Sequence, residues 1–207
     1  MMDKIYEYHL RPQENMTKRS INMARTPTVT RDQVPEKFRD AFDAETSDNG
    51  GPIDSGPGSA MIHSPEMRRR ANHLVHYLRD ESELPQRILE LAKLIAGRAM
   101  DCEFIWNAHA AWGRREGLSD ALVGALRDKK PLPPAPADEQ ALIDFGTELF
   151  ATKRVKQETF DAAIDQFGAL QLTELTTLMG YYSLLAMNAN AFEIDLPENR
   201  TEPVLPV

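Results

Sequence analysis

The chain has 207 residues, a hydrophobic content of 42% and a formal net charge of −8. This length suits one domain with tails, and the acidic balance argues against general binding to nucleic acid or to an anionic membrane. A single cysteine excludes an internal disulfide and a multi-cysteine zinc site. Because the sequence has no apolar run of about 18 residues and no signal-peptide pattern at its start, we expect a cytoplasmic protein without a transmembrane helix.

The N-terminal part is irregular. Residues 1–29 are polar and show no sustained period, so we expect a flexible extension that is either dispensable or packed on a neighbouring subunit. A short helix is predicted between Thr30 and Ala44, because Pro35 suits a first helical position and two phenylalanines lie four residues apart. Residues 46–60 contain three Gly-Pro or Pro-Gly steps, which predict a shaped loop and no helix.

Two helices are predicted after this loop. The first begins at Pro65, and its apolar residues fall on one stripe that should face the core: Met67, Ala71, Leu74, Val75 and Leu78. The second begins at Pro85 and is apolar nearly all round as far as Ala99. A helix of that kind is expected at the centre of a fold.

The C-terminal half also indicates helices. A proline-rich extended connector at 131–136 is followed by a helix from Asp138, a short helix around 160–167 and a long helix from about Gln171 to Ala191. No segment alternates like a strand, so the predicted fold class is all-α. We expect a compact multi-helix domain over residues 30–197 and a tail over residues 198–207.

The richest chemistry lies on the helix after Ala99. This helix carries Cys102, Trp106 and His109. Trp106 lies four residues after Cys102, and His109 lies three residues after Trp106 and seven after Cys102, so all three lie on one side of the helix. A histidine beside a tryptophan on a mostly apolar face is a candidate proton carrier in a dry pocket. Gly117 is expected to end this helix, and Ser119 is expected to cap the next one.

Four stretches resemble one protein family. They are GPGSAMIHSPEM, LPQRILELAKLIAGR, CEFIWNAHAAWGRREGLS and FGALQLTELTTLMGYYSLLAMNANAFEIDLP. They resemble the carboxymuconolactone decarboxylase family, which includes the alkylhydroperoxidase-type proteins, over roughly residues 56–197. The resemblance implies a compact all-α fold of that type, assembly into trimers or hexamers, and a site between helices near a subunit contact.

The same resemblance implies roles for individual residues. Peroxidase-type members carry C-x-x-C, a histidine four residues later and a glutamate one helix earlier. Cys102 fits the first cysteine, His109 the histidine and Glu90 the glutamate, but Ile105 occupies the position of the second cysteine. A lone thiol cannot close the local disulfide of such a redox cycle. The sequence therefore resembles the decarboxylase-like branch, which keeps a tryptophan and histidine like Trp106 and His109.

Without the resemblance, the two candidate catalytic residues have simpler interpretations. His109 is then an ordinary helix histidine, and a helical wheel favours a solvated Glu90. The resemblance implies instead that Glu90 turns inward, with room provided by Gly97, and orients or relays protons to His109.

The candidate substrate-binding residues are Trp106, Cys102, His63 and Tyr182. Trp106 forms a pocket wall or belongs to the core. Cys102 is first a small buried residue and second a reactive thiol. His63 either reaches a pocket or is a loop histidine, and Tyr182 is either core or lines the site with its hydroxyl.

Three functions remain open. The first is a decarboxylase-like lyase, in which His109 moves a proton on a small carboxylated or lactone-type substrate and Glu90 sets its protonation. The second is an alkylhydroperoxidase-like redox protein of peroxiredoxin type that uses Cys102 and an outside thiol. The third is a non-catalytic oligomeric scaffold. We expect a homo-oligomer, a small-molecule substrate, no organic cofactor and no metal, since His73 and His76 lack further ligands in a suitable spacing.

Overall fold

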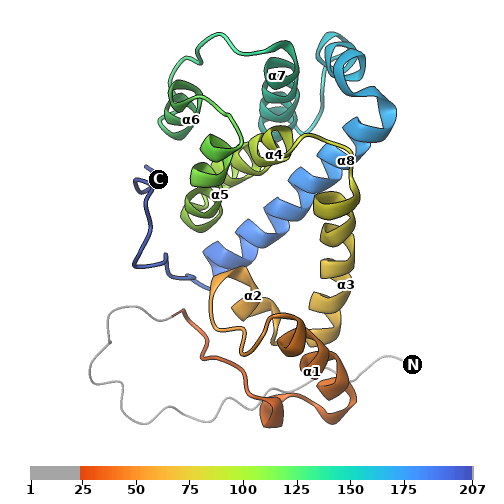
Figure 1. The fold of residues 1–207 in the computed structure, drawn as a ribbon, viewed down its shortest axis with the longest axis vertical. Helices are drawn as coiled ribbons and strands as arrows, with labels where there is room; N and C mark the ends of the chain where they lie inside the picture. The colour runs from red at the N-terminus through yellow and green to blue at the C-terminus, as the bar shows by residue number, and fades with distance from the viewer. Residues whose placement is uncertain (1–23, 207) are drawn as a thin grey trace.

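A computed structural model describes residues 24–206, and within this range the chain forms helices and no strand (Figure 1). The α-helices are α1 (Arg39–Asp48), α2 (Gly56–Met61), α3 (Pro65–His76), α4 (Gln86–Ala99), α5 (Glu103–Arg115), α6 (Asp120–Arg127), α7 (Ala137–Thr152) and α8 (Gln157–Ala191). Two 3-10 turns, Arg31–Gln33 and Glu36–Phe38, precede α1, and a π-helical turn, Tyr77–Glu81, follows α3. The predicted all-α class is confirmed.

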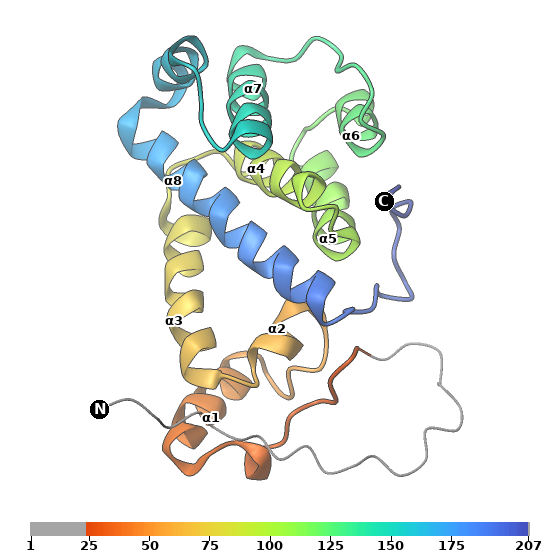
Figure 2. The same ribbon diagram turned by 180° about the vertical axis from the view of Figure 1, so that it is seen from behind.

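Helix α4 lies at the centre of the domain. It packs against α5, α7 and α8 (Figures 1 and 2), and every residue from Ile88 to Arg98 is buried. Pro85 precedes its first turn, where a missing N–H leaves no hydrogen bond unmade. The central position expected from the all-round apolar pattern is confirmed.

Helix α8 is two helices joined by a kink. Gly168 has φ 65° and ψ 173°, so the short helix before it and the long helix after it are separate, as the sequence predicts. The proline-rich connector runs extended into α7. Ser119 caps α6 by accepting a hydrogen bond from the N–H of Leu122 at 3.1 Å, also as expected.

The loop predicted for residues 46–60 is wrong at both ends, because α1 continues to Asp48 and Gly56–Met61 forms α2. Gly56 has φ 63° and turns the chain, and Pro57 then occupies an early helical position that needs no N–H donor. Ala60 and Met61 are buried and fix the short helix to the core. A Gly-Pro step can therefore begin a helix as well as prevent one.

The predicted inward stripe of α3 is also partly wrong, since Met67 and Leu74 are 47% and 44% exposed. The helix turns Arg68 and Asn72 inward instead, because both bind the buried carboxylate of Glu45 on α1. The Nε atom of Arg68 lies 3.0 Å from Oε2 of Glu45, and Nδ2 of Asn72 donates to the same oxygen at 2.6 Å. A buried polar cluster thus decides which side of α3 faces the domain.

Both ends of the described chain contact the helices. The N–H of Arg25 donates to the carbonyl of Phe192, just after α8, at 2.9 Å. The C-terminal segment lies along α5, with Leu205 buried and the Asn107 amide donating to the Glu202 carbonyl at 3.1 Å. Most of the predicted extension, residues 1–23, lies outside the described residues. Of the helices in residues 24–206, none combines the length and apolarity that crossing a bilayer requires.

Candidate functional site

The candidate site is formed where α4 and α5 lie side by side. A tight turn at Met100–Asp101 joins the two helices, and Asp101 takes the left-handed conformation with φ 46°. Gly97 lets the helices approach closely, because a Cβ atom there would lie 3.0 Å from Cγ2 of Ile105. This close packing brings the side chains of Glu90 and His109 together across the helix pair.

Glu90 and His109 form a hydrogen bond in which Nδ1 of His109 lies 2.8 Å from Oε2 of Glu90. Lys93, one turn after Glu90, donates from Nζ to the other carboxylate oxygen, Oε1, at 2.6 Å. The exposed fractions of the side chains are 8% for Glu90, 3% for Lys93 and 17% for His109. The inward turn of Glu90 expected from the family resemblance is therefore present, and the solvated position favoured by the helical wheel is wrong.

The charges of this group set its protonation. Burial acts to raise the pKa of Glu90, but the hydrogen bond with His109 and the charge of Lys93 outweigh burial, so its pKa is lowered. Burial lowers the pKa of His109; the Glu90 carboxylate opposes this and the Lys93 ammonium reinforces it, and the net direction is down. Lys93 already neutralises Glu90, so a proton on His109 would add an uncompensated buried charge. The resting state is an ion pair beside a neutral imidazole.

The tautomer of His109 follows from its partner. An ionised carboxylate only accepts hydrogen bonds, so Nδ1 of a neutral His109 carries the proton and donates it to Glu90. Within the described residues, Nε2 has no hydrogen-bond partner. His109 is thus oriented as a base with a free lone pair at Nε2, the arrangement of a histidine held by a carboxylate for proton transfer.

Tyr182 of α8 covers the other side of the histidine. Its ring packs edge-on against the His109 ring, with centroids 4.9 Å apart, and Nζ of Lys93 lies 5.5 Å from the Tyr182 ring centroid. Burial raises the pKa of Tyr182, and the nearby charge of Glu90 adds to the effect. The structure therefore brings three predicted site residues together: Glu90, His109 and Tyr182.

Cys102 is fully buried at the N-cap of α5. Burial raises the pKa of its thiol, although the backbone N–H groups of Ile105 and Phe104 act in the opposite direction. Reactive cysteines are usually partly exposed with a lowered pKa. The first interpretation of Cys102, a small buried residue, agrees with this placement.

Trp106 and His63 stand apart from this group. Trp106 is fully buried, and its indole N–H lacks a partner among the described residues, so it serves as core packing between helices. His63 is exposed in the turn between α2 and α3, and its hydrogen-bond partner is the backbone of Pro27. No hydrogen bond, ion pair or ring contact joins His63 to Glu90 or His109 in the described structure.

Lys93 belongs to this group but was not predicted from the sequence. A lysine that is nearly fully buried requires a partner, and Glu90 three residues earlier provides it. The sequence offered one indication of this role: Lys93 is one of two polar side chains among the buried, mainly apolar positions from Ile88 to Gly97. In residues 24–206, no group of three or more His, Cys, Asp or Glu side chains is arranged to hold a metal ion.

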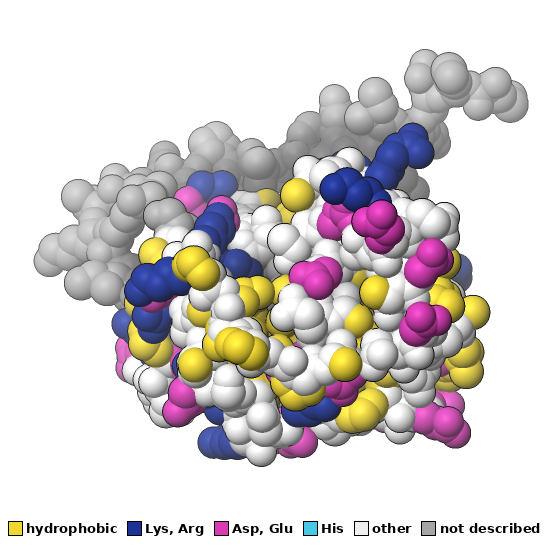
Figure 3. All heavy atoms as spheres, turned by 90° about the horizontal axis from the view of Figure 1, so that it is seen from above, with side chains coloured by type: hydrophobic (Ala, Val, Ile, Leu, Met, Phe, Trp, Pro, Cys, Tyr) yellow, Lys and Arg dark blue, Asp and Glu magenta, His cyan; other side chains and the backbone are white. Residues whose placement is uncertain are grey.

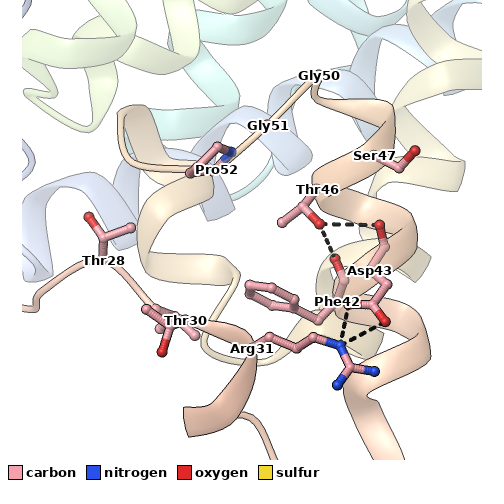
Figure 4. A pocket seen from close by; sticks show the side chains of 11 residues that line it. Thr28, Thr30, Arg31, Phe42, Asp43, Thr46, Ser47, Gly50, Gly51 and Pro52 are labelled. Atoms are coloured by element: carbon pink, nitrogen blue, oxygen red, sulfur yellow. Dashed lines mark hydrogen bonds and ion pairs between the residues drawn. The ribbon is translucent and has the colours of Figure 1, made fainter.

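Three cavities of the described structure lie away from the His109 group. One of them, of about 690 Å³, lies between residues 28–31, α1 and the Gly50–Pro52 turn (Figure 4). Arg31 and Asp43 pair at its edge, and the ring of Phe42 points into it. Another cavity, of about 370 Å³ and with acidic lining residues, lies between the start of α5 and the end of α8. None of these is lined by Glu90, Lys93 or His109.

Comparison with solved structures identifies the fold. A protein of unknown function from Agrobacterium tumefaciens, a candidate antioxidant defence protein AhpD, is 22% identical with a TM-score of 0.60, over 66% of this chain and 94% of that chain. An uncharacterized peroxidase-related protein with an alkylhydroperoxidase AhpD core, from Ralstonia eutropha JMP134, is 17% identical with a TM-score of 0.65, over 86% of this chain and 95% of that chain. A cysteine-to-alanine variant of the debrominase Bmp8 with 2,3,4-tribromopyrrole is 13% identical with a TM-score of 0.61, over 87% and 95% of the two chains.

The chain therefore has the fold of the AhpD-like and carboxymuconolactone decarboxylase-like proteins, as the sequence resemblance implied. No protein-family model and no curated protein sequence matches the chain. At these identities the comparisons establish the fold and leave the chemistry to the residues of the site.

Proposed function

We propose that the protein is an enzyme in which His109 transfers a proton on a small carboxylated or lactone-type substrate. The observation that carries the proposal is the hydrogen bond of 2.8 Å between Nδ1 of His109 and Glu90, with Lys93 bound to the same carboxylate. A histidine with a fixed tautomer and a lowered pKa is a ready base at neutral pH.

The proposed proton transfer uses both ring nitrogens of His109. Nε2 accepts a proton from the substrate or from water, and the imidazolium that forms is stabilised by its Nδ1–H bond to Glu90. In a decarboxylation the substrate carboxylate leaves as carbon dioxide, and its bonding electron pair moves into the conjugated substrate. Nε2–H then delivers the proton that replaces the lost carboxyl group on carbon, which returns His109 to its neutral form.

The test is a panel of lactone carboxylates and β-keto or conjugated carboxylic acids, with substrate loss followed by absorbance and carbon dioxide release measured directly. We expect His109→Ala to lose about 10²–10⁴-fold in turnover with an unchanged fold. The matched control is His73→Ala, since His73 is an exposed histidine of α3. Turnover that survives in His109→Ala, or that falls equally in the control, would exclude the proposal.

Thiol chemistry at Cys102 is the second candidate, because two of the similar structures are described as AhpD-type or peroxidase-related. It requires reduction of a peroxide to water or an alcohol by the thiolate, followed by reduction of the oxidised sulfur by an outside thiol. Burial and the raised pKa of Cys102 disfavour it. Thiol-dependent peroxide loss that disappears in Cys102→Ser and persists in His109→Ala would select this candidate over proton transfer.

A further inference from the structure

A second cavity, of about 400 Å³, lies on the other side of α4 from the His109 group. It is lined by the C-terminal half of α4, the end of α6, the start of the connector and the end of α7. Its apolar wall is formed by Ile95, Leu126, Leu132 and Phe150. The volume falls within the range of about 300–1,000 Å³ that is typical of small-molecule sites.

The cavity and the His109 group are separate. A helix advances about 100° per residue, so Ile95 and Ala99, which line the cavity, lie roughly 140–180° around α4 from Glu90. A ligand in this cavity would therefore lie across α4 from Nε2 of His109, and its binding is independent of the proposed proton transfer.

The polar lining of the cavity is cationic. Arg98, Lys129 and Lys130 line it and no acidic residue does, although the whole chain has a formal net charge of −8. From the end of the molecule that carries α6 and α7, hydrophobic side chains are visible at the surface between charged ones (Figure 3). A basic, apolar cavity in an acidic protein favours an anion with an apolar body.

The nearby carboxylates are each shared by two cations. Asp101 pairs with both Arg98 and Lys129, and Asp128 pairs with both Arg127 and Lys130. Three of these cations, Arg98, Lys129 and Lys130, line the cavity and neither carboxylate does, so positive charge is in excess along its lining. The Lys129 and Lys130 side chains are mostly exposed, and they can turn to an incoming anion without a large desolvation cost.

Arg98 lies at the polar edge of this cavity. The residue is only 8% exposed, yet its Nε–H is buried and has no partner among the described residues. The other two nitrogens are satisfied, one by Asp101 and the other by the carbonyl of Pro206 at 3.1 Å. Because this N–H has no accessible surface, an anion in the cavity would interact with the positive charge of Arg98 and not with its Nε–H.

We propose that this cavity binds an amphipathic organic anion, with its hydrocarbon body against Leu126, Leu132 and Phe150 and its carboxylate bound by Lys129 and Lys130, beside the positive charge of Arg98. The apolar wall contributes affinity, and the cations select anions over neutral or cationic analogues of the same length.

The test uses octanoate, octan-1-ol and octyltrimethylammonium, all below micelle-forming concentrations, in calorimetric titrations of the full-length protein. We expect octanoate to bind one site per chain, octan-1-ol to bind at least tenfold more weakly and the cation not to bind. Amide chemical shifts in a ¹⁵N-labelled sample should change around residues 125–132 and 147–151. Equal affinity of octanoate and octan-1-ol, or no octanoate binding, would overturn the proposal.

Variants localise the binding. The double variant Lys129→Gln with Lys130→Gln should lower the affinity for octanoate about tenfold, because each exposed ion pair with the carboxylate contributes about threefold. Arg69→Gln with Arg70→Gln on α3 removes the same charge far from the cavity and should change nothing. An equal effect of the two pairs would mean non-specific attraction.

Two further variants separate the cavity from the site at His109. Ala125→Phe, which fills the cavity from α6, should abolish octanoate binding; if it does not fold, the lysine pair decides the question. Glu90→Gln should leave octanoate affinity unchanged. A loss of affinity in Glu90→Gln would place the anion at His109 and refute the second site.

Discussion

Replacement of Lys93 by methionine tests the charge balance of the site, because methionine keeps an unbranched chain and removes the ammonium that binds Glu90 at 2.6 Å. Removal of one partner from a buried ion pair typically costs about 3–5 kcal/mol. Here the cost should depend on pH, since His109 is the second partner of Glu90 and can take up a proton to supply the lost charge. We expect Lys93→Met to lower the free energy of unfolding by about 3–5 kcal/mol at pH 8 and by clearly less at pH 5.

The sign of the pH dependence differs between the two proteins. In the wild type the pKa of His109 is lowered on folding, so stability falls as the pH drops below the unfolded pKa of about 6.5. In Lys93→Met the unbalanced carboxylate of Glu90 should raise the pKa of His109 above its unfolded value. The resulting stabilisation is complete below about pH 6.5 and is lost as the pH rises through the folded pKa. The pKa of Glu90 is lowered, so its own contribution is lost only below about pH 4.3.

The assay is urea unfolding followed by tryptophan fluorescence between pH 5 and 8, with the His109 ring proton titrated by NMR in both proteins. Lys156→Met is the matched control, because Lys156 is exposed and lies 3.7 Å from Glu148; its cost should stay within about 0.5 kcal/mol at every pH. A pKa of His109 that does not rise in folded Lys93→Met, or a cost that is independent of pH, would refute the charge-balance argument.

Three further predictions concern the helix pair and the groups proposed for catalysis. Gly97→Ala should destabilise the fold by about 1–3 kcal/mol in thermal unfolding because the helices must separate, whereas Gly124→Ala, with open space around it, should be neutral or stabilising by up to about 1 kcal/mol. Cys102→Ser should keep most of the proton-transfer turnover measured on the substrate panel; complete loss with an intact fold would return thiol chemistry to first place. Glu90→Gln should reduce turnover less than His109→Ala and shift the pH profile, and the double variant should be little worse than His109→Ala; additive losses would show that the two residues act separately.

The parts of the fold that follow from local chemistry were predictable. Ser119, the proline before α4 and the proline-rich connector fix helix ends through hydrogen bonds that are made or cannot be made within a few residues. The failures came from contacts distant in sequence. Glu45 and Asn72 are 27 residues apart, and no periodicity of α3 alone reveals that a carboxylate on α1 draws its polar side inward.

The site shows the same division. The spacing of Trp106 and His109 predicted that they lie on one side of α5, but only the family resemblance predicted that Glu90 turns inward. A helical wheel treats each polar residue singly, and the burial of Glu90 depends on Lys93 and His109 being buried with it. Tyr182, more than 70 residues after His109 in the chain, packs against it from α8. Local patterns therefore identify the donors and acceptors of a site, whereas their partners depend on tertiary packing.

The last prediction concerns self-association. On α8, Leu170, Leu184 and Met187 are exposed large apolar side chains. Spacings of 14 and 3 residues place them on one side of the helix. Gly180 lies between them in the chain, and a Cβ atom added there would have no neighbouring atom within 4 Å, so this part of the helix is open. Exposed apolar rows of this kind are typical of protein interfaces, so we expect an oligomer rather than a monomer of 23.3 kDa.

Light scattering checks this expectation directly. Leu184→Lys with Met187→Lys should lower the measured mass towards 23.3 kDa, because paired subunits would bring buried like charges together. Met67→Lys with Leu74→Lys is the matched control, since these residues are similarly exposed on α3 and should leave the mass unchanged. A wild-type mass of one chain at micromolar concentration would contradict self-association. If the Met67→Lys and Leu74→Lys variant dissociated instead, the interface would lie on α3 and not on α8.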